Sequence, residues 1–262
     1  IDTLLASLLI TGSISWLYYA DRLLELPIGL VAITIATVML PNLSRLHAAH
    51  SQAGFSRTLD WGLRVSLLFA LPAAVALYLL AVPVIATIFY RGALTALDVR
   101  MTALAVQAFA VGMVAFTLVK VLAPAYFARQ DMRTPLRIAV IAVSVNVVLN
   151  LALFQIMGHV GLALATTTAA VVQSWLLLRG ILQGGHFRPD GAFYRYLGKL
   201  VAATAVMALP LIYVSPPAQA WLTMTSVTRT GWLAGVCCAG GALYFLVVWL
   251  LGVRPAHLRY HV

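Results

Sequence analysis

Seven long apolar stretches constrain the fold of this chain more than any other feature of its sequence. A helix of about 20 apolar residues crosses the hydrocarbon layer of a membrane, which is roughly 30 Å thick. The stretches of this kind are residues 13–40, 61–90, 99–127, 136–157, 160–182, 196–214 and 231–251. We therefore predict an all-α fold, a polytopic bundle of about seven full transmembrane helices. Residues 1–10 would form the end of an eighth.

The composition excludes an ordinary soluble domain. Only 9% of the residues are charged and 63% are hydrophobic, whereas soluble proteins carry roughly 25% charged residues to keep their surfaces wet. The net charge of +10 comes from 17 Lys and Arg against 7 Asp and Glu. These basic residues lie mostly in short loops between the apolar stretches, which is typical of membrane proteins rather than of a nucleic-acid-binding surface.

Every second connection between the stretches is rich in arginine. The arginine-rich connections are those around residues 41–60, 128–135 and 183–195, and the C-terminal tail shares their character. The connections between them, at 91–98, 158–159 and 215–230, carry few basic residues or none. Basic loops are retained on the cytoplasmic side of a membrane. We therefore expect a multi-pass protein whose C-terminus faces the cytoplasm.

A polar stripe interrupts the first apolar stretch. Asp21, Arg22 and Glu25 lie about two turns inside it, where a charge costs at least about 2.5–3.5 kcal/mol unless it faces water or protein. At about 100° per residue, Ser15 and Tyr18 share the face of Arg22 and Glu25. Arginine binds phosphate oxygens in a bidentate way, and neighbouring acids hold its guanidinium in position. We interpret the stripe as the wall of a cavity for a phosphorylated ligand; the alternative is a self-neutralised cluster that anchors the helix.

We expect no catalytic residue, metal or cofactor. The sequence has no Gly-rich phosphate loop, no Ser/His/Asp set and no cluster of acids on a basic loop that would hold Mg²⁺. His47 and His50 are two ligands on a basic loop and make a poor metal site. Cys237 and Cys238 are adjacent in an apolar run and are interpreted as small helix residues. Lys120, inside the third stretch, is expected to reach toward the cytoplasmic interface, with a second cation of the cavity as the alternative.

Several segments resemble one family of membrane transporters. The clearest is SWLYYADRLLELPIGLVAITIATVMLPNLSR at 15–45, which resembles the signature of the MurJ (MviN) lipid II flippases. These belong to the multidrug/oligosaccharidyl-lipid/polysaccharide exporter superfamily. Further matches are DWGLR at 60–64, FALP at 69–72 and VKVLAPAYFARQDMRTPLRIA at 119–139. The order of these segments is also that of the family.

The resemblance implies the C-terminal lobe of a fourteen-helix exporter with two pseudo-symmetric lobes. Residues 1–183 would hold the end of helix seven and helices eight to twelve. Residues 184–262 would form two peripheral helices, thirteen and fourteen, and a cytoplasmic tail. The chain opens IDTLLASLLI, without Met or the basic region of a signal peptide, so we expect it to continue upstream. The absent N-terminal lobe would then be its partner.

The resemblance also implies a substrate and the residues that bind it. The substrate is lipid II, the undecaprenyl-pyrophosphate-linked precursor of peptidoglycan, moved from the inner to the outer leaflet of the bacterial cytoplasmic (inner) membrane by alternating access. Asp21, Arg22 and Glu25 would line the central cavity, with Ser15 on the same side, and the last two helices would form a groove for the lipid tail. A flippase for another polyprenyl-linked saccharide, or a drug exporter of the same superfamily, stays open as the alternative.

Overall fold

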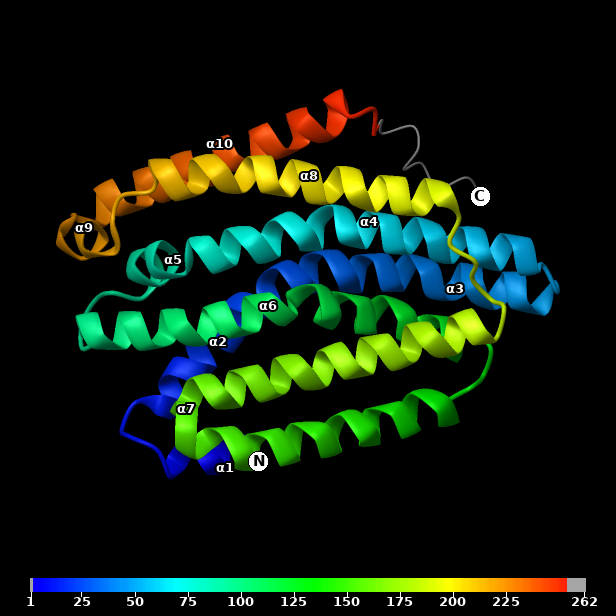
Figure 1. The fold of residues 1–262 in the computed structure, drawn as a ribbon, viewed down its shortest axis with the longest axis horizontal. Helices are drawn as coiled ribbons and strands as arrows, with labels where there is room; N and C mark the ends of the chain where they lie inside the picture. The colour runs from blue at the N-terminus through cyan, green and yellow to red at the C-terminus, as the bar shows by residue number, and fades with distance from the viewer. Residues whose placement is uncertain (1, 254–262) are drawn as a thin grey trace.

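The computed structural model describes residues 2–253 and shows helices joined by short turns (Figure 1). No strand occurs in this part of the chain, so the predicted all-α bundle is confirmed. In chain order the elements are α1 (Asp2–Ser7), α2 (Ser13–Ile28), the π-helical turn η1 (Gly29–Ile33), α3 (Thr34–Ala48), α4 (Gln52–Leu79), α5 (Ala81–Ile88), α6 (Ala96–Phe127), α7 (Arg133–Gln183), α8 (Gly191–Val214), α9 (Ala218–Thr223) and α10 (Ser226–Leu250).

Six continuous helical segments in the described residues are long and apolar enough to cross a membrane. One of them, α7, contains two arms, because Gly158 has φ 58° and ψ −136° and reverses the chain. Only glycine adopts such a conformation readily. Figure 1 shows the two arms lying side by side. The predicted turn at residues 158–159 is therefore confirmed, and the segments amount to the seven crossings predicted from the sequence.

Proline explains two local departures from regular α-helix. The apolar stretch 61–90 belongs to two elements, because α4 ends at Leu79 and α5 starts at Ala81. Pro83 lies in the first turn of α5, where its missing N–H leaves no helical hydrogen bond unmade. Pro27 lies at the end of α2, just before the wider π-helical turn.

The arginine-rich connections gather at one end of the bundle. The α3–α4 turn, the α6–α7 connection, the α7–α8 loop and the end of α10 lie on the right in Figure 1. A hydrogen bond from Gln52 Nε2 to the carbonyl oxygen of Gly185 (3.2 Å) joins two of these loops. The opposite end holds the α1–α2 turn, the α5–α6 loop, the turn between the two arms of α7, and α9. Which side of the membrane each end faces stays a prediction.

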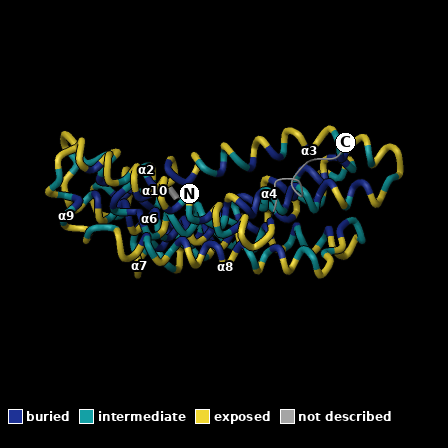
Figure 2. Tube along the Cα trace, turned by 90° about the horizontal axis from the view of Figure 1, so that it is seen from above, coloured by how far each residue is buried: buried dark blue, intermediate teal, exposed yellow. Residues whose placement is uncertain are grey.

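The core is built around α6, which packs against α2, α3, α4, α5 and α7. Small residues let the helices approach closely: Gly112 of α6 faces the side chain of Thr167, and Gly62 of α4 faces that of Met39. Viewed from above in Figure 2, buried residues run along the inside and exposed residues along the outside of an elongated bundle. Many exposed side chains are large and apolar, such as Leu30 and Ile156, as lipid contact requires.

The helices α8 and α10 lie together at one edge of the bundle, above α4 and α5 in Figure 1. They have their own cluster of buried side chains, which includes Leu200, Met207, Tyr244 and Val248. The Tyr244 hydroxyl donates to the carbonyl oxygen of Leu68 in α4 at 2.7 Å and ties the pair to the rest of the molecule. The predicted division of the chain at residue 183 stays a prediction.

Candidate substrate-binding cavity

The helix α2 has one buried and one exposed face. Trp16, Ala20, Leu23 and Ile28 recur at helical spacing and are buried, mainly against α6. The five residues of the predicted polar stripe are all exposed: Ser15, Tyr18, Asp21, Arg22 and Glu25. The apolar pattern of α2 thus turns the charged groups away from the core.

Arg22 and Glu25 form an exposed ion pair. Arg22 Nη1 donates to Glu25 Oε2 at 3.0 Å, and the two side chains are 57% and 59% exposed. The guanidinium also lies over the ring of Tyr18, with its carbon 5.1 Å from the ring centroid. Exposed ion pairs contribute only about 0–1 kcal/mol in water, so a stronger anion can displace Glu25. Against lipid the same charges would be costly, which makes this face of α2 a surface for water or protein.

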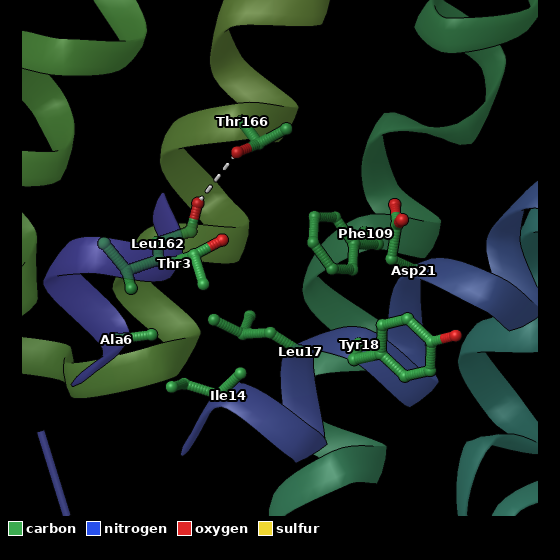
Figure 3. A pocket seen from close by; sticks show the side chains of 9 residues that line it. All are labelled: Thr3, Ala6, Ile14, Leu17, Tyr18, Asp21, Phe109, Leu162 and Thr166. Atoms are coloured by element: carbon green, nitrogen blue, oxygen red, sulfur yellow. Dashed lines mark hydrogen bonds between the residues drawn. The ribbon is translucent and has the colours of Figure 1, made fainter. Parts of the chain in front are cut away.

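A cavity of about 330 Å³ opens beside this stripe, between α1, α2, α6 and α7 (Figure 3). Of the predicted residues, Asp21 and Tyr18 line it, whereas Ser15, Arg22 and Glu25 do not. Its other lining residues are Thr3, Ala6, Ile14, Leu17, Phe109, Leu162 and Thr166. Tyr18 touches both sites, because it lines the cavity and carries the guanidinium of Arg22 over its ring. The cavity and the ion pair therefore adjoin.

A chain of hydrogen bonds continues from the cavity wall into the two arms of α7. Asn146 Nδ2 donates to Thr166 Oγ1 at 3.1 Å, and Asn150 Nδ2 donates to Asn146 Oδ1 at 3.0 Å. Thr166 in turn donates to the carbonyl oxygen of Leu162 at 3.1 Å, as Figure 3 shows. The bond from Asn146 to Thr166 joins the two arms across the hairpin, as expected for amides in membrane helices, and the other two bonds lie within one arm each.

Sequence reasoning missed Phe109, Leu162 and Thr166 as parts of the cavity wall. Aromatic, aliphatic and hydroxyl residues are ordinary in membrane helices, and a threonine there usually bonds its own helix backbone. Lys120 is exposed eleven residues after Phe109, about 16 Å along α6 on the same face. It does not line the cavity.

A second small cavity, of about 120 Å³, lies at the arginine-rich end. It brings His186, which the sequence did not single out, together with the predicted pair His47 and His50. Gln52 Nε2 lies 3.1 Å from His186 Nδ1. Burial, followed by the electrostatic influence of the nearby Arg129 and His47 side chains, lowers the pKa of His186 below its usual value. Within residues 2–253 no group of three His, Cys, Asp or Glu side chains is arranged to hold a metal ion.

Comparison with known proteins identifies the family. The family model described as lipid II flippase MurJ matches residues 1–231, most of the chain. The chain belongs to the MurJ family. This confirms the resemblance predicted from the sequence.

Curated relatives from the MurJ family match nearly the whole chain. It is 41% identical to a probable lipid II flippase MurJ of Vibrio cholerae over 98% of its length, which is 49% of that relative. It is 40% identical to one of Haemophilus influenzae, covering 98% of the chain and 52% of the relative. The lipid II flippase MurJ of Burkholderia cenocepacia is 36% identical and matches 99% of the chain and 50% of its own length. The chain thus spans about half the length of these relatives.

A solved structure shares the fold. It is titled lipid II flippase MurJ, inward closed conformation, and superposes with a TM-score of 0.76 at 24% sequence identity. The match covers 95% of this chain and 48% of that one. The helix arrangement described above is therefore that of a MurJ fold.

Proposed function

We propose that the complete protein moves lipid II from the inner to the outer leaflet of the cytoplasmic membrane, and that this chain supplies its C-terminal lobe. The observation that carries the proposal is the exposed Arg22–Glu25 pair beside a cavity, in a helix long and apolar enough to cross the membrane. The relatives' names, lipid II flippase MurJ, give the substrate. The protein acts as a transporter rather than an enzyme.

The chemistry of the substrate requires such a site. A pyrophosphate-linked saccharide cannot cross hydrocarbon unaided, so the carrier offers it a hydrated, cationic path that opens to one side at a time. Arg22 exchanges Glu25 for the oxygens of the pyrophosphate, which offer it bidentate hydrogen bonds. Glu25 keeps the guanidinium in position between transport events, and Asp21 lines the adjoining cavity. Ser15 and Tyr18 supply hydroxyl groups on the same face.

The exposed polar face of α2 needs a cover other than lipid, because ionised side chains in hydrocarbon are costly. We assign that cover to an N-terminal lobe, in line with the half-length match to the relatives. The cavity then lies between two lobes. Alternating access consists of the lobes rocking about it.

The tail of the lipid requires an apolar path. An apolar cavity of about 190 Å³ lies between α4, α8 and α10, lined by Phe69, Met207, Leu211, Tyr244 and other largely apolar residues. We assign the polyprenyl tail to this groove, and we identify α8 and α10 with the two peripheral helices expected to form it. The arginine-rich end of the bundle, with the C-terminus, faces the cytoplasm. Lipid II enters from that side.

The test is depletion of the complete protein from a bacterium that depends on it. We expect lipid II to accumulate in the inner leaflet and to become inaccessible to a probe added from outside the membrane. An unchanged distribution of lipid II between the leaflets would overturn the proposal. Accumulation of a different polyprenyl-linked saccharide would assign the protein to that substrate instead.

A further inference from the structure

A basic pocket lies at the arginine-rich end, apart from the cavity beside α2. Its volume is about 230 Å³, and it lies between α4, the first turns of α8 and the residues that follow α10. Three of its lining side chains are cationic: Arg64, Arg195 and Lys199. The rest of the lining is Ala192, Tyr196, Gly252 and Val253. None of these lining residues is acidic.

Arg64 forms the fixed wall of this pocket. Its Nε donates to Asp60 Oδ2 at 2.6 Å, and its Nη2 lies 3.6 Å from Asp190 Oδ1. Its guanidinium carbon lies 5.5 Å from the ring centroid of Phe193 and 5.3 Å from that of Tyr196. The side chain is 19% exposed. Arg64 is therefore neutralised and held in place by the protein itself.

Arg195 and Lys199 differ from Arg64, because they are not paired with a carboxylate. In residues 2–253 neither lies within salt-bridge distance of a carboxylate. Arg195 Nε donates only to the carbonyl oxygen of Gly191, at 3.3 Å. The two cations are one turn apart on α8, and like charges at this spacing repel each other. An anion bound between them would remove that repulsion.

The pocket lies at the depth of lipid headgroups. The 24 residues of α8 span about 36 Å, more than the roughly 30 Å of hydrocarbon. Only the first turns of α8 line the pocket. A left-handed glycine after α10, Gly252 with φ 80°, turns the chain at the pocket, where Lys199 Nζ would lie 3.9 Å from a Cβ at this position. A Cβ there would make only ordinary van der Waals contact, so glycine is favoured at 252 by its backbone conformation rather than by space.

Two of the helices that line the pocket, α4 and α8, also line the apolar groove, and α10 completes the groove just before Gly252 and Val253. On α4 the groove begins at Phe69, five residues or about 8 Å beyond Arg64. A headgroup in the pocket would thus have an apolar surface next to its acyl chains. Basic pockets between transmembrane helices on the cytoplasmic side are known to hold anionic headgroups.

We propose that this pocket binds the phosphate of an anionic glycerophospholipid, held by Arg195 and Lys199 against the wall formed by Arg64. Such a lipid is a fixed companion of α8 and α10, not the transported substrate. The inference rests on the position of this end at a membrane surface and does not depend on translocation of lipid II. Its test is a binding measurement, so the two proposals can fail separately.

The experiment is native mass spectrometry of the complete protein in detergent, titrated with phosphatidylglycerol and, separately, with phosphatidylcholine. We expect phosphatidylglycerol to bind more tightly, and Arg195→Gln with Lys199→Gln to weaken its binding about tenfold. The matched control, Arg57→Gln with Arg133→Gln, removes the same charge from exposed positions at the same end and should bind like the wild type. The conservative pair Arg195→Lys with Lys199→Arg should retain most of the binding.

Three results would overturn the proposal. They are equal binding of the two lipids, wild-type binding by the double glutamine variant, and displacement of the lipid by inorganic phosphate alone, which would indicate a simple anion site. Thermal melting of each variant checks that it folds. If the double variant does not fold, Lys199→Gln alone serves, and unchanged binding of phosphatidylglycerol to it would equally overturn the proposal.

Discussion

The contacts of Arg22 with Glu25 and Tyr18 are exposed and weak enough to be exchanged. Its partner Glu25 is one turn away and more than half exposed, and Tyr18 supports the guanidinium from the side of the cavity. A buried ion pair would resist separation, because each charge would be left without a partner in a dry interior. An exposed pair has no such barrier. Under the proposed function, the affinity of this site comes from the anion that replaces Glu25 rather than from the ion pair itself.

Replacement of Arg22 tests that view. We expect Arg22→Ala in the complete protein to lower transport at least about tenfold and to abolish growth of cells that depend on it. Arg22→Lys should retain part of the activity, because lysine keeps the charge but loses bidentate contact. The matched control is Arg57→Ala, an exposed arginine remote from the cavity, with protein in the membrane measured for each. Normal growth on Arg22→Ala would remove Arg22 from the substrate site.

We expect the stability of the folded protein to depend on pH through His186, at the arginine-rich end. Because burial, Arg129 and His47 lower its pKa in the folded protein, the unfolded state binds a proton more readily. The stability linked to this residue is present above the ordinary pKa of about 6.5 and is lost as the pH falls below it. Protonation of Nδ1 would also remove the acceptor that faces Gln52 Nε2.

We therefore expect the melting temperature of the wild type to fall between about pH 7 and pH 5 and the fall to be smaller in His186→Gln. His50→Gln, a change at another histidine of the same small cavity, is the matched control. Melting curves followed by circular dichroism over this pH range provide the measurement. Identical slopes for wild type and His186→Gln would contradict the assignment.

At the scale of the helices, the sequence predicted where the chain crosses but not where each helix ends. Apolar residues mark only the part in hydrocarbon, whereas the backbone hydrogen bonds of α3 continue to Ala48 and those of α4 begin at Gln52, in polar sequence. The charged stripe was predictable because charges are rare in apolar stretches. Phe109 and Thr166 were not, because only the packing of α6 and α7 against α2 brings them to the cavity.

Gly158 is the point on which the hairpin of α7 depends. A side chain there would have space, since nothing lies within 4 Å of the position that a Cβ would take, but its φ of 58° with ψ of −136° is unfavourable for any residue except glycine. We expect Gly158→Ala to cost about 1–3 kcal/mol, seen as a lower melting temperature. Gly198→Ala, in the interior of α8 with equal space, is the control and should be neutral or slightly stabilising. Equal melting temperatures for the two variants would show that the turn tolerates a side chain.

At the scale of the whole molecule, the bundle has two kinds of surface. Most of its length is covered with large apolar side chains, whereas one stripe of α2 carries ions, and the arginine-rich loops meet at one end. Lipid can cover the apolar surface, whereas the ionic stripe of α2 needs water or protein next to it. The asymmetry of charge between the two ends sets the expected orientation in the membrane.

The orientation can be measured with single cysteines in a cysteine-free form of the complete protein. Val227→Cys is in the first turn of α10, which starts at the end opposite the arginine-rich loops, and Arg188→Cys is in the α7–α8 loop. Both positions are exposed. We expect an impermeant maleimide added to intact cells to label the cysteine at 227 and to reach the one at 188 only after the membrane is opened. The reverse pattern would place the C-terminus outside.

The π-helical turn at Gly29–Ile33 has a consequence for the charged face of α2. Such a turn holds one residue more than an α-helical turn, so everything before it is rotated by about 100° relative to everything after it. Deleting a single residue there would restore regular hydrogen bonding and shorten the crossing by only about 1.5 Å. It would also swing the ionic groups of α2 from their present side toward a neighbouring helix or the lipid. The number of residues in this turn therefore determines the direction in which Arg22 points.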